Sequence, residues 1–215
     1  MKKKLLIFDL DGTIANTIYS IRDGVNMAMD KYGFPQRSYE EIRAAIGNGA
    51  RELIRLSLPE KKRADSLLVD AVFADYNIFY GITYKNIDGC YPHMNESLHT
   101  LKDRGYVIAV LSNKQDHYVK KIVELLFPDG TVSYAAGQTE LPRKPDPTVP
   151  LMIAKEFGVS PEQCVFIGDS DVDVMTAKNS GMTSVACSWG YRPREELSGA
   201  DMIIDSADML TVLFE

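Results

Sequence analysis

Two aspartates in the segment Asp9–Thr13 are the first side chains with the types and spacing of a reaction centre. Asp9 and Asp11 follow directly on the apolar run Leu5–Phe8, so both can reach one point beyond the end of a buried strand. Gly12 allows a ligand to approach the backbone closely. A turn with solvated aspartates is the simpler explanation. The position favours chemistry, because open α/β sheets bind ligands beyond the carboxyl ends of their strands.

A second acidic group lies in Gly168–Asp173, again between an apolar run and the start of a helical pattern. Asp171 and Asp173 occupy positions where acidic side chains commonly cap a helix. Asp169 comes one residue after the predicted strand, where a capping role fits less well. Carboxylates delivered by two strand ends favour a hard cation with oxygen ligands, and Mg²⁺ suits them.

A polar pair and a lysine complete the candidate residues. Ser112 and Asn113 follow the predicted strand Val107–Leu111, where they could equally cap the next helix. Lys144 lies in the segment Arg143–Pro147, whose two prolines stiffen the chain and would aim the lysine side chain. A single lysine is otherwise normally a solvated surface group.

These residues need a framework that brings strand ends together, and the remaining sequence predicts one. Short apolar runs predict parallel strands at Leu5–Phe8, Val107–Leu111, Val132–Ala136, Val165–Ile167 and Thr183–Ala186, with an edge strand at Met202–Ile204. Helical patterns, each followed closely by Gly or Pro, cover residues 94–104, 116–126, 148–157 and 172–180. This alternation predicts a doubly wound α/β fold with a Rossmann-like parallel sheet.

Residues 16–81 break the alternation. Apolar residues recur there at helical spacing, as at Ile18, Ile21 and Val25, and no run predicts a strand. We therefore expect an inserted α-helical domain after the first strand. The α/β core would then consist of residues 1–15 and 82–215.

Composition excludes several classes of protein. The chain of 215 residues is 45% hydrophobic, too apolar for a mostly disordered protein. Its 24 Lys and Arg against 30 Asp and Glu give a net charge of −6, which disfavours binding to nucleic acid or an anionic membrane. No apolar run approaches the roughly 18 residues of a membrane span, and the run before Asp9 is too short for a signal peptide. The cysteines are few and widely spaced, so we expect a reduced, cytoplasmic protein.

The four motifs together resemble the signature of the haloacid dehalogenase superfamily of phosphatases. They occur in that family's order and spacing, and the resemblance covers nearly the whole chain, including the helical insert, which corresponds to the family's cap. The chain is most similar to the phosphoglycolate phosphatase-like members. Three further segments, Ile46–Gly49, Ala177–Gly181 and Trp189–Tyr191, add to the likeness.

The resemblance implies the reaction and its cofactor. Asp9 would be the nucleophile that forms an aspartyl-phosphate. Asp11 would be the general acid for the leaving group and then the general base for water. Mg²⁺ would bind Asp9, the backbone carbonyl of Asp11 and Asp169.

The resemblance also implies how the phosphoryl group is held. Ser112, Asn113 and Lys144 would bind its oxygens, with Asn113 helping to orient the nucleophile loop. Asp173 would orient Lys144 or a metal-bound water. Lys114 would be structural.

The cap would select the substrate, for which 2-phosphoglycolate is the first candidate. Gly47, Asn48, Gly49 and Arg51 resemble the substrate-specificity loop of capped relatives. The glycines let backbone N–H groups approach a ligand, and Arg51 can grip a carboxylate bidentately. An ordinary helix start, with Asn48 as its cap and Arg51 solvated, would explain the same residues.

Two alternatives to a phosphatase stay open. A sugar phosphomutase of the same superfamily uses the same two aspartates but passes the phosphoryl group to a sugar. A non-catalytic phosphate-binding regulatory module would not need them, although both are present. In each case we expect a small phosphorylated metabolite as the partner, no nucleic acid or membrane, and a monomer or a homodimer.

Overall fold

The structure, a computed structural model, describes residues 3–215. It divides into two compact units, one formed by the chain up to Ala15 together with Gly89–Glu215, and the other by Asn16–Asp88. The sequence analysis places the end of the insert at residue 81. That position lies inside α4 (Ser66–Thr83), and the chain returns to the first unit only at Gly89.

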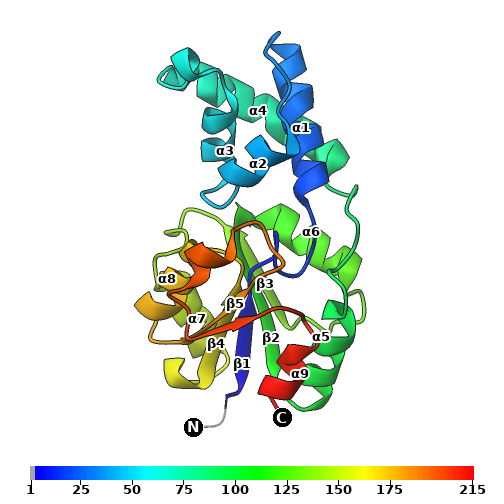
Figure 1. Ribbon diagram of the computed structural model, residues 1–215, viewed down its shortest axis with the longest axis vertical. Coiled ribbons are helices and arrows are strands. Elements are labelled where there is room, and N and C mark those ends of the chain that lie inside the picture. Colours follow the sequence, from blue (N-terminus) through cyan, green and yellow to red (C-terminus); the bar gives the residue numbers. More distant parts are fainter. Residues whose placement is uncertain (1–2) are drawn as a thin grey trace. The chain divides into compact units, whose positions relative to one another are not determined.

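The first unit is built on a six-stranded parallel sheet in the order β3-β2-β1-β4-β5-β6 (Figure 1). The strands are β1 (Leu5–Phe8), β2 (Val107–Gln115), β3 (Tyr134–Gln138), β4 (Cys164–Gly168), β5 (Thr183–Cys187) and β6 (Met202–Ile204). Leu5 of β1 pairs with Val107 on one side and with Cys164 on the other. Because β1 is central and every one of its residues is buried, its sequence is an unbroken apolar run.

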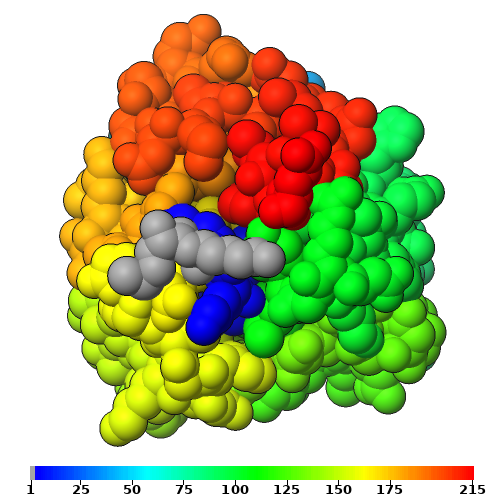
Figure 2. Space-filling view, turned by 90° about the horizontal axis from the view of Figure 1, so that it is seen from below, coloured from blue at the N-terminus to red at the C-terminus, as the bar shows by residue number. Residues whose placement is uncertain are grey.

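Helices cover both faces of the sheet (Figure 1). One face carries α5 (Met94–Asp103) and α6 (Asp116–Leu126), and the other carries α7 (Thr148–Glu156) and α8 (Asp171–Asn179). Leu5 and Ile7 of β1 share one buried cluster with Ile153 of α7 and Ala177 of α8. The shorter helices of this unit are η2 (Pro161–Gln163), η3 (Arg194–Leu197) and α9 (Met209–Leu213). Figure 2 looks onto the amino ends of the strands, where the chain just before β1 (blue) lies among α5 (green), the segment before β4 (yellow) and α9 (red).

The predicted fold class is confirmed, with differences at element ends. β3 begins at Tyr134 rather than Val132, after a turn in which Asp129 accepts a hydrogen bond of 3.0 Å from the backbone N–H of Thr131. β2 continues past Leu111 to Gln115 and so contains Ser112 and Asn113. The N-cap of α6 is Gln115, so the helix-capping alternative for the polar pair is wrong.

The regular elements of the second unit, residues 16–88, are all helices, and the sequence predicts a helical insert over residues 16–81. It contains α1 (Ile18–Lys31), α2 (Tyr39–Ala45), α3 (Ala50–Ser57), the short η1 (Glu60–Lys62) and α4. α1 packs against α4 through its buried face, which includes Ile18, Ile21 and Val25. Gly24 eases this approach, since a Cβ atom there would lie only 3.2 Å from Oγ1 of Thr83 and 3.3 Å from the ring of Tyr76. In the described part of the chain, no helix has both the length and the apolar character needed to cross a membrane.

Candidate active site

The carboxyl ends of β1, β2 and β4 meet at one edge of the sheet, and the polar residues that follow or end them are buried there. Asp9, Ser112 and Asp169 are each exposed by 9% or less. The backbone N–H of Asp9 donates to the carbonyl of Ile167 at 2.8 Å, which ties the loop after β1 to β4. The polar residues that the sequence marks as candidates in the first unit therefore lie together at one edge of the sheet.

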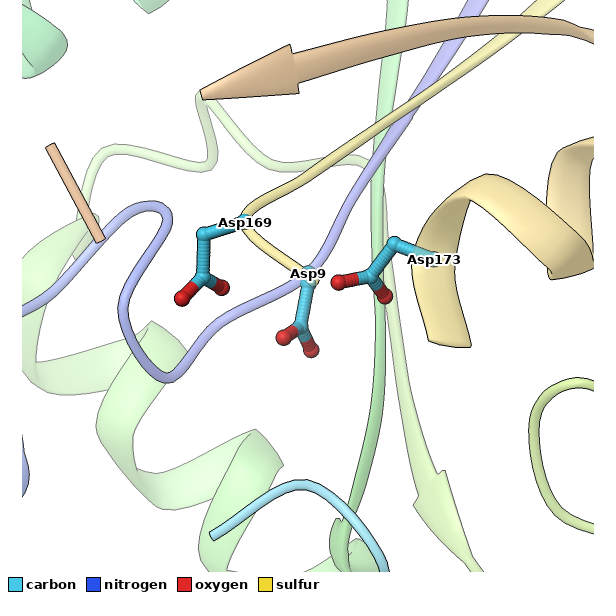
Figure 3. A group of neighbouring side chains, drawn as sticks. All are labelled: Asp9, Asp169 and Asp173. Carbon is cyan, nitrogen blue, oxygen red and sulfur yellow. The ribbon is translucent and has the colours of Figure 1, made fainter. Parts of the chain in front are cut away.

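Asp9, Asp169 and Asp173 form a compact group of carboxylates (Figure 3). One oxygen from each lies within 4.8 Å of the others, and Asp9 stands between the other two in this view. They come from the residue after β1, the residue after β4 and the first turn of α8. Buried negative charges this close together are costly unless cations compensate them.

Lys144 supplies one such cation. Its Nζ lies 2.8 Å from Oδ1 of Asp9 and 2.7 Å from Oδ1 of Asp173, and its side chain is buried. The other oxygen of Asp173 accepts hydrogen bonds from the hydroxyl and the backbone N–H of Ser170, at 2.6 and 3.1 Å. Both oxygens of Asp173 are therefore engaged by protein donors. This is the geometry expected of a residue that orients Lys144, although the role itself stays a prediction.

Asn113 engages the backbone of Lys144 from the other side. Its Nδ2 donates to the carbonyl of Lys144 at 3.1 Å, and its Oδ1 accepts from the N–H of the same residue at 2.9 Å. The sequence analysis expects Asn113 to bind phosphate. These two bonds instead direct its amide to the segment that carries the lysine, which makes positioning of Lys144 the task that the geometry supports.

Asp169 is held by neutral donors. The hydroxyl of Thr13 donates to its Oδ1 at 3.0 Å, and the backbone N–H of Tyr191 donates to its Oδ2 at 2.6 Å. The indole N–H of Trp189 donates in turn to the carbonyl of Thr13 at 3.1 Å. The sequence analysis gives no site role to these three residues. Their place in the sequence was the available signal, since they follow β1 and β5, which end at the same edge of the sheet.

Two glycines make the space that Asp169 occupies. A Cβ atom on Gly190 would collide with the side chain of Asp169, and one on Gly12 would meet the same carboxylate. Gly12 also has a φ of 89°, which L side chains rarely adopt. Two separate constraints therefore require glycine at position 12: the space taken by Asp169 and the positive φ.

Asp11 lies beside the cluster but has its own cation. The Nζ of Lys114 lies 2.7 Å from Oδ1 and 2.9 Å from Oδ2 of Asp11, and the two side chains are 8% and 10% exposed. The backbone N–H of Lys114 donates to the hydroxyl of Ser112 at 3.3 Å. A structural role was expected for Lys114 from the family resemblance, so its contact with the proposed acid and base is a finding of the structure.

Burial and mutual repulsion shift the titration of the cluster. Burial, with the charges of Asp173 and Asp9, raises the pKa of Asp169 to about 8, although Tyr191 and Thr13 work in the opposite direction. Burial raises the pKa of Asp9 to about 6 despite the opposing effect of Lys144. Burial alone would lower the pKa of Lys144, but the charges of Asp173 and Asp9 overcome it, so this pKa lies above its ordinary value.

The donor set fits a divalent cation. Oδ1 of Asp9 is buried and lies 2.8 Å from the Lys144 ammonium. Each oxygen of Asp169 accepts a hydrogen bond from a neutral donor, Thr13 or Tyr191, and neither of these donors balances its negative charge. An oxygen-binding cation between Asp9 and Asp169 would satisfy both, and Mg²⁺ prefers such ligands.

The loop expected to select the substrate lies wholly in the second unit. Gly47 and Gly49 have φ values of 121° and 83°, and Gly49 rather than Asn48 is the N-cap of α3. Arg51 lies in the first turn of α3, where its Nε is 2.7 Å from Oδ1 of Asp70 on α4. Both side chains are about half exposed, at 48% and 57%. The alternative with Asn48 as cap is therefore wrong, and Arg51 has an acidic partner within its own unit.

Comparison with known proteins gives a consistent result. The family model of haloacid dehalogenase-like hydrolases matches residues 6–187. A phosphoglycolate phosphatase of Haemophilus influenzae strain 86-028NP is 34% identical over 98% of both chains. Phosphoglycolate phosphatase 1 of Pseudomonas aeruginosa is 30% identical over 96% of this chain and 78% of its own length.

Solved structures show the same architecture. A protein proposed to be a phosphoglycolate phosphatase, from Lactobacillus delbrueckii subsp. bulgaricus, superposes with a TM-score of 0.89 and 30% identity over 100% of this chain and 99% of its own. A β-phosphoglucomutase from Clostridium difficile gives a TM-score of 0.80 over 98% of this chain and 93% of its own, at 22% identity. At that identity the second likeness speaks for the fold alone.

Proposed function

The chain belongs to the haloacid dehalogenase-like hydrolases and is a phosphatase, and we propose that it hydrolyses 2-phosphoglycolate, or a similarly small phosphorylated acid, through an intermediate on Asp9. The observation that carries the proposal is the position of Asp9. Its carboxylate stands at the carboxyl end of the central strand, 2.8 Å from the ammonium of Lys144 and within 4.8 Å of the carboxylate of Asp169, in a chain whose relatives are phosphoglycolate phosphatases over nearly their full length.

In the proposed first step, an oxygen of Asp9 attacks the phosphorus in line with the leaving oxygen. A bond forms between the carboxylate and phosphorus, and the bond from phosphorus to the substrate oxygen breaks. The Lys144 ammonium beside Asp9 would hold the phosphoryl oxygens and neutralise part of the charge that develops on them.

Asp11 would supply and then remove the proton. It protonates the leaving alkoxide in the first step, and in the second it takes a proton from the water that attacks phosphorus. The second step breaks the bond between phosphorus and Asp9, releases phosphate and restores the nucleophile. One carboxyl can serve both steps because the first step leaves it deprotonated and the proton taken from water in the second step restores its acid form.

The remaining core residues would prepare these groups. Ser112 would donate its hydroxyl to a phosphoryl oxygen, since it is buried at the end of β2. Asn113 and Asp173 would fix the backbone and the ammonium of Lys144, respectively.

Asp9, Asp169 and the backbone carbonyl of Asp11 would hold Mg²⁺. The bound ion would offset the repulsion between the nucleophilic carboxylate and the phosphate dianion. The proximity of the Asp9 and Asp169 carboxylates supports this assignment, as do the burial and repulsion that raise the pKa of Asp169 to about 8.

The second unit would act as the cap that reads the rest of the substrate. Phosphoglycolate carries a carboxylate beside its phosphate, and Arg51 in the loop with Gly47, Asn48 and Gly49 could pair with it. To do so, Arg51 would have to exchange Asp70 for the substrate. Such exposed ion pairs are worth only about 0–1 kcal/mol, so the exchange costs little.

A panel of phosphorylated metabolites assayed for released phosphate with Mg²⁺ tests this function. We expect the highest kcat/KM for 2-phosphoglycolate among small phosphorylated acids. Glucose 1-phosphate is included because a phosphomutase would convert it without net release of phosphate. Isomerisation of a sugar phosphate with little phosphate release would contradict the proposed hydrolysis.

A further inference from the structure

The Lys114–Asp11 ion pair has no part in the proposed phosphoryl transfer. We propose that Lys114 is a positioning residue that acts through Asp11, holding both carboxylate oxygens so that this carboxyl stays fixed beside Asp9. The inference rests on the proposed function, in which Asp11 is the general acid and base. It adds a residue to which the motifs assign no catalytic task.

The cost of burying this pair argues for a function. The ammonium of Lys114 contacts both oxygens of Asp11, at 2.7 and 2.9 Å, and both side chains are at most 10% exposed. Removing two charges from water costs about as much as their attraction returns, so well-packed apolar residues would usually serve stability equally well. A buried pair at the edge of a catalytic site is therefore better explained by what it does to Asp11.

Lys114 lies where β2 departs from a regular strand. The pairing of β2 with β3 shifts register between Leu111 and Gln115, so simple alternation of side chains does not hold there. The backbone N–H of Lys114 donates to the Ser112 hydroxyl at 3.3 Å. Asn113 between them bonds instead to the backbone of Lys144. One short segment thus provides a phosphate ligand, a support for Lys144 and a support for Asp11.

The two lysines pair with different carboxylates of the site. Lys144 contacts Asp9 and Asp173, and Lys114 contacts Asp11. A single ammonium that binds both oxygens fixes the rotation of the Asp11 carboxyl as well as its position. Fixed geometry matters here because proton transfer requires close approach to the leaving oxygen, and a displacement of about 1 Å can cost a hundredfold in rate.

The test compares Lys114→Met with Asp11→Asn on two leaving groups. An alkyl phosphate such as 2-phosphoglycolate needs a proton on its leaving oxygen, whereas the nitrophenolate of p-nitrophenyl phosphate leaves without one. We measure single-turnover rates for the first substrate and the burst of nitrophenol for the second, and assay Lys114→Arg and the double variant alongside. Lys120→Met is the matched control, since Lys120 is 60% exposed and pairs with Asp116 on α6.

If Lys114 acts through Asp11, Lys114→Met should lose about a hundredfold on the alkyl phosphate and little in the burst. Adding Lys114→Met to Asp11→Asn should cause no further loss, because residues that act as a unit are not additive. Lys114→Arg should recover part of the alkyl rate, and Lys120→Met should match the wild type. Equal losses on both substrates, or a full additional loss in the double variant, would overturn the proposal.

Stability is controlled in the same set of variants. If Lys114→Met unfolds because Asp11 is left buried without its cation, the double variant should regain thermal stability, since it removes both charges. The comparison of the double variant with Asp11→Asn then still tests the proposal. If Asp11→Asn itself lost the same factor in rate on both substrates, the proposed role of Asp11 would be contradicted, and with it that of Lys114. If Asp11→Asn lost rate mainly on the alkyl phosphate but Lys114→Met did not, the role of Lys114 alone would be overturned.

Discussion

The Nζ atom of Lys144 lies 2.7 Å from Oδ1 of Asp173, and both side chains are almost completely buried. This contact joins the segment before α7 to the first turn of α8. In the sequence, these two segments precede and follow β4. Lys144 therefore has a fixed place from which it also reaches Asp9, at 2.8 Å. An ammonium held in advance need not be reorganised when charge develops on the phosphoryl group.

Asp173→Asn should lower kcat/KM by about ten- to a hundredfold, because Lys144 loses the charge that anchors it. The loss should be similar for alkyl and aryl phosphates, since both present the same phosphoryl group to Lys144. The control is Asp171→Asn, two residues away on α8 with an exposed side chain. Steady-state kinetics on both substrates provide the measurement, and an Asp173→Asn enzyme as active as the Asp171→Asn enzyme would contradict the role.

Mg²⁺ should raise the melting temperature of the wild type but not of Asp169→Asn. A ligand present at a hundred times its Kd adds about 2.7 kcal/mol, and for a chain of this size 1 kcal/mol corresponds to roughly 2–4 °C. We therefore expect a shift of about 5–10 °C for the wild type, measured by calorimetry with and without the ion. Without Mg²⁺, the variant should be at least as stable as the wild type, because it removes one of three crowded carboxylates.

Asp171→Asn serves again as the control, because it lowers the charge of the same helix but lies outside the carboxylate group. It should keep the full shift. Equal Mg²⁺ shifts in the wild type and Asp169→Asn would show that the ion binds without Asp169.

Much of this site could be predicted because it depends on local pattern. The apolar run Leu5–Phe8 followed at once by Asp9 identifies the central strand and the edge at which it ends. A parallel strand buried on both faces is apolar throughout, so a charged residue directly after it stands out. The same argument applies to β4 and Asp169.

The supporting contacts could not be predicted, because they join residues far apart in the chain. Lys114 and Asp11 are separated by 103 positions, and Asn113 and Lys144 by 31. Periodicity gives the face on which a side chain lies but not its partner on another strand or loop. The insert also extends beyond residue 81, because α4 continues to Thr83 and the chain returns to the first unit at Gly89.

Arg51→Ala should raise KM for 2-phosphoglycolate by about ten- to a hundredfold, the effect of losing a charge-assisted contact worth roughly 1.5 to 3 kcal/mol. It should change little for p-nitrophenyl phosphate, which lacks the carboxylate. The matched variant is Asp70→Asn, which removes the partner of Arg51 and leaves the arginine in place. We expect Asp70→Asn to keep or lower KM for 2-phosphoglycolate. If both variants raised KM alike, Arg51 would serve the pair with Asp70 and not the substrate.

The stability of the core should depend on pH through His99. Its ring nitrogens contact the carbonyl of Asn95 at 2.7 Å and Oδ2 of Asp129 at 2.6 Å. The hydrogen bond to Asn95 and then that to Asp129 raise the pKa of His99, and His99 with Thr131 lowers the pKa of Asp129 to about 2. Because the folded state favours protonated His99, its contribution is complete below the unfolded pKa of about 6.5 and is lost as pH rises through the folded value.

The measurement is the free energy of unfolding of the wild type and of His99→Gln at about pH 6 and about pH 9. The advantage of the wild type should be larger at the lower pH. It should also disappear in strongly acidic solution, as Asp129 becomes protonated near its folded pKa of about 2. If the wild type's advantage in free energy of unfolding were larger at about pH 9 than at about pH 6, the assigned role of His99 would be contradicted.

The central claim is a covalent phosphoryl group on Asp9, and trapping it is the most direct measurement. The Asp11→Asn enzyme is suited to this, because the loss of the general base should slow hydrolysis of the intermediate by about 10²–10⁴. It is mixed with Mg²⁺ and p-nitrophenyl phosphate that carries a radiolabelled phosphate, quenched in acid, digested and analysed by mass spectrometry. We expect one labelled peptide, modified at Asp9, and no label when Asp9→Asn is added to the same enzyme. Release of nitrophenol with no labelled protein, or equal labelling when Asp9 is replaced, would contradict it.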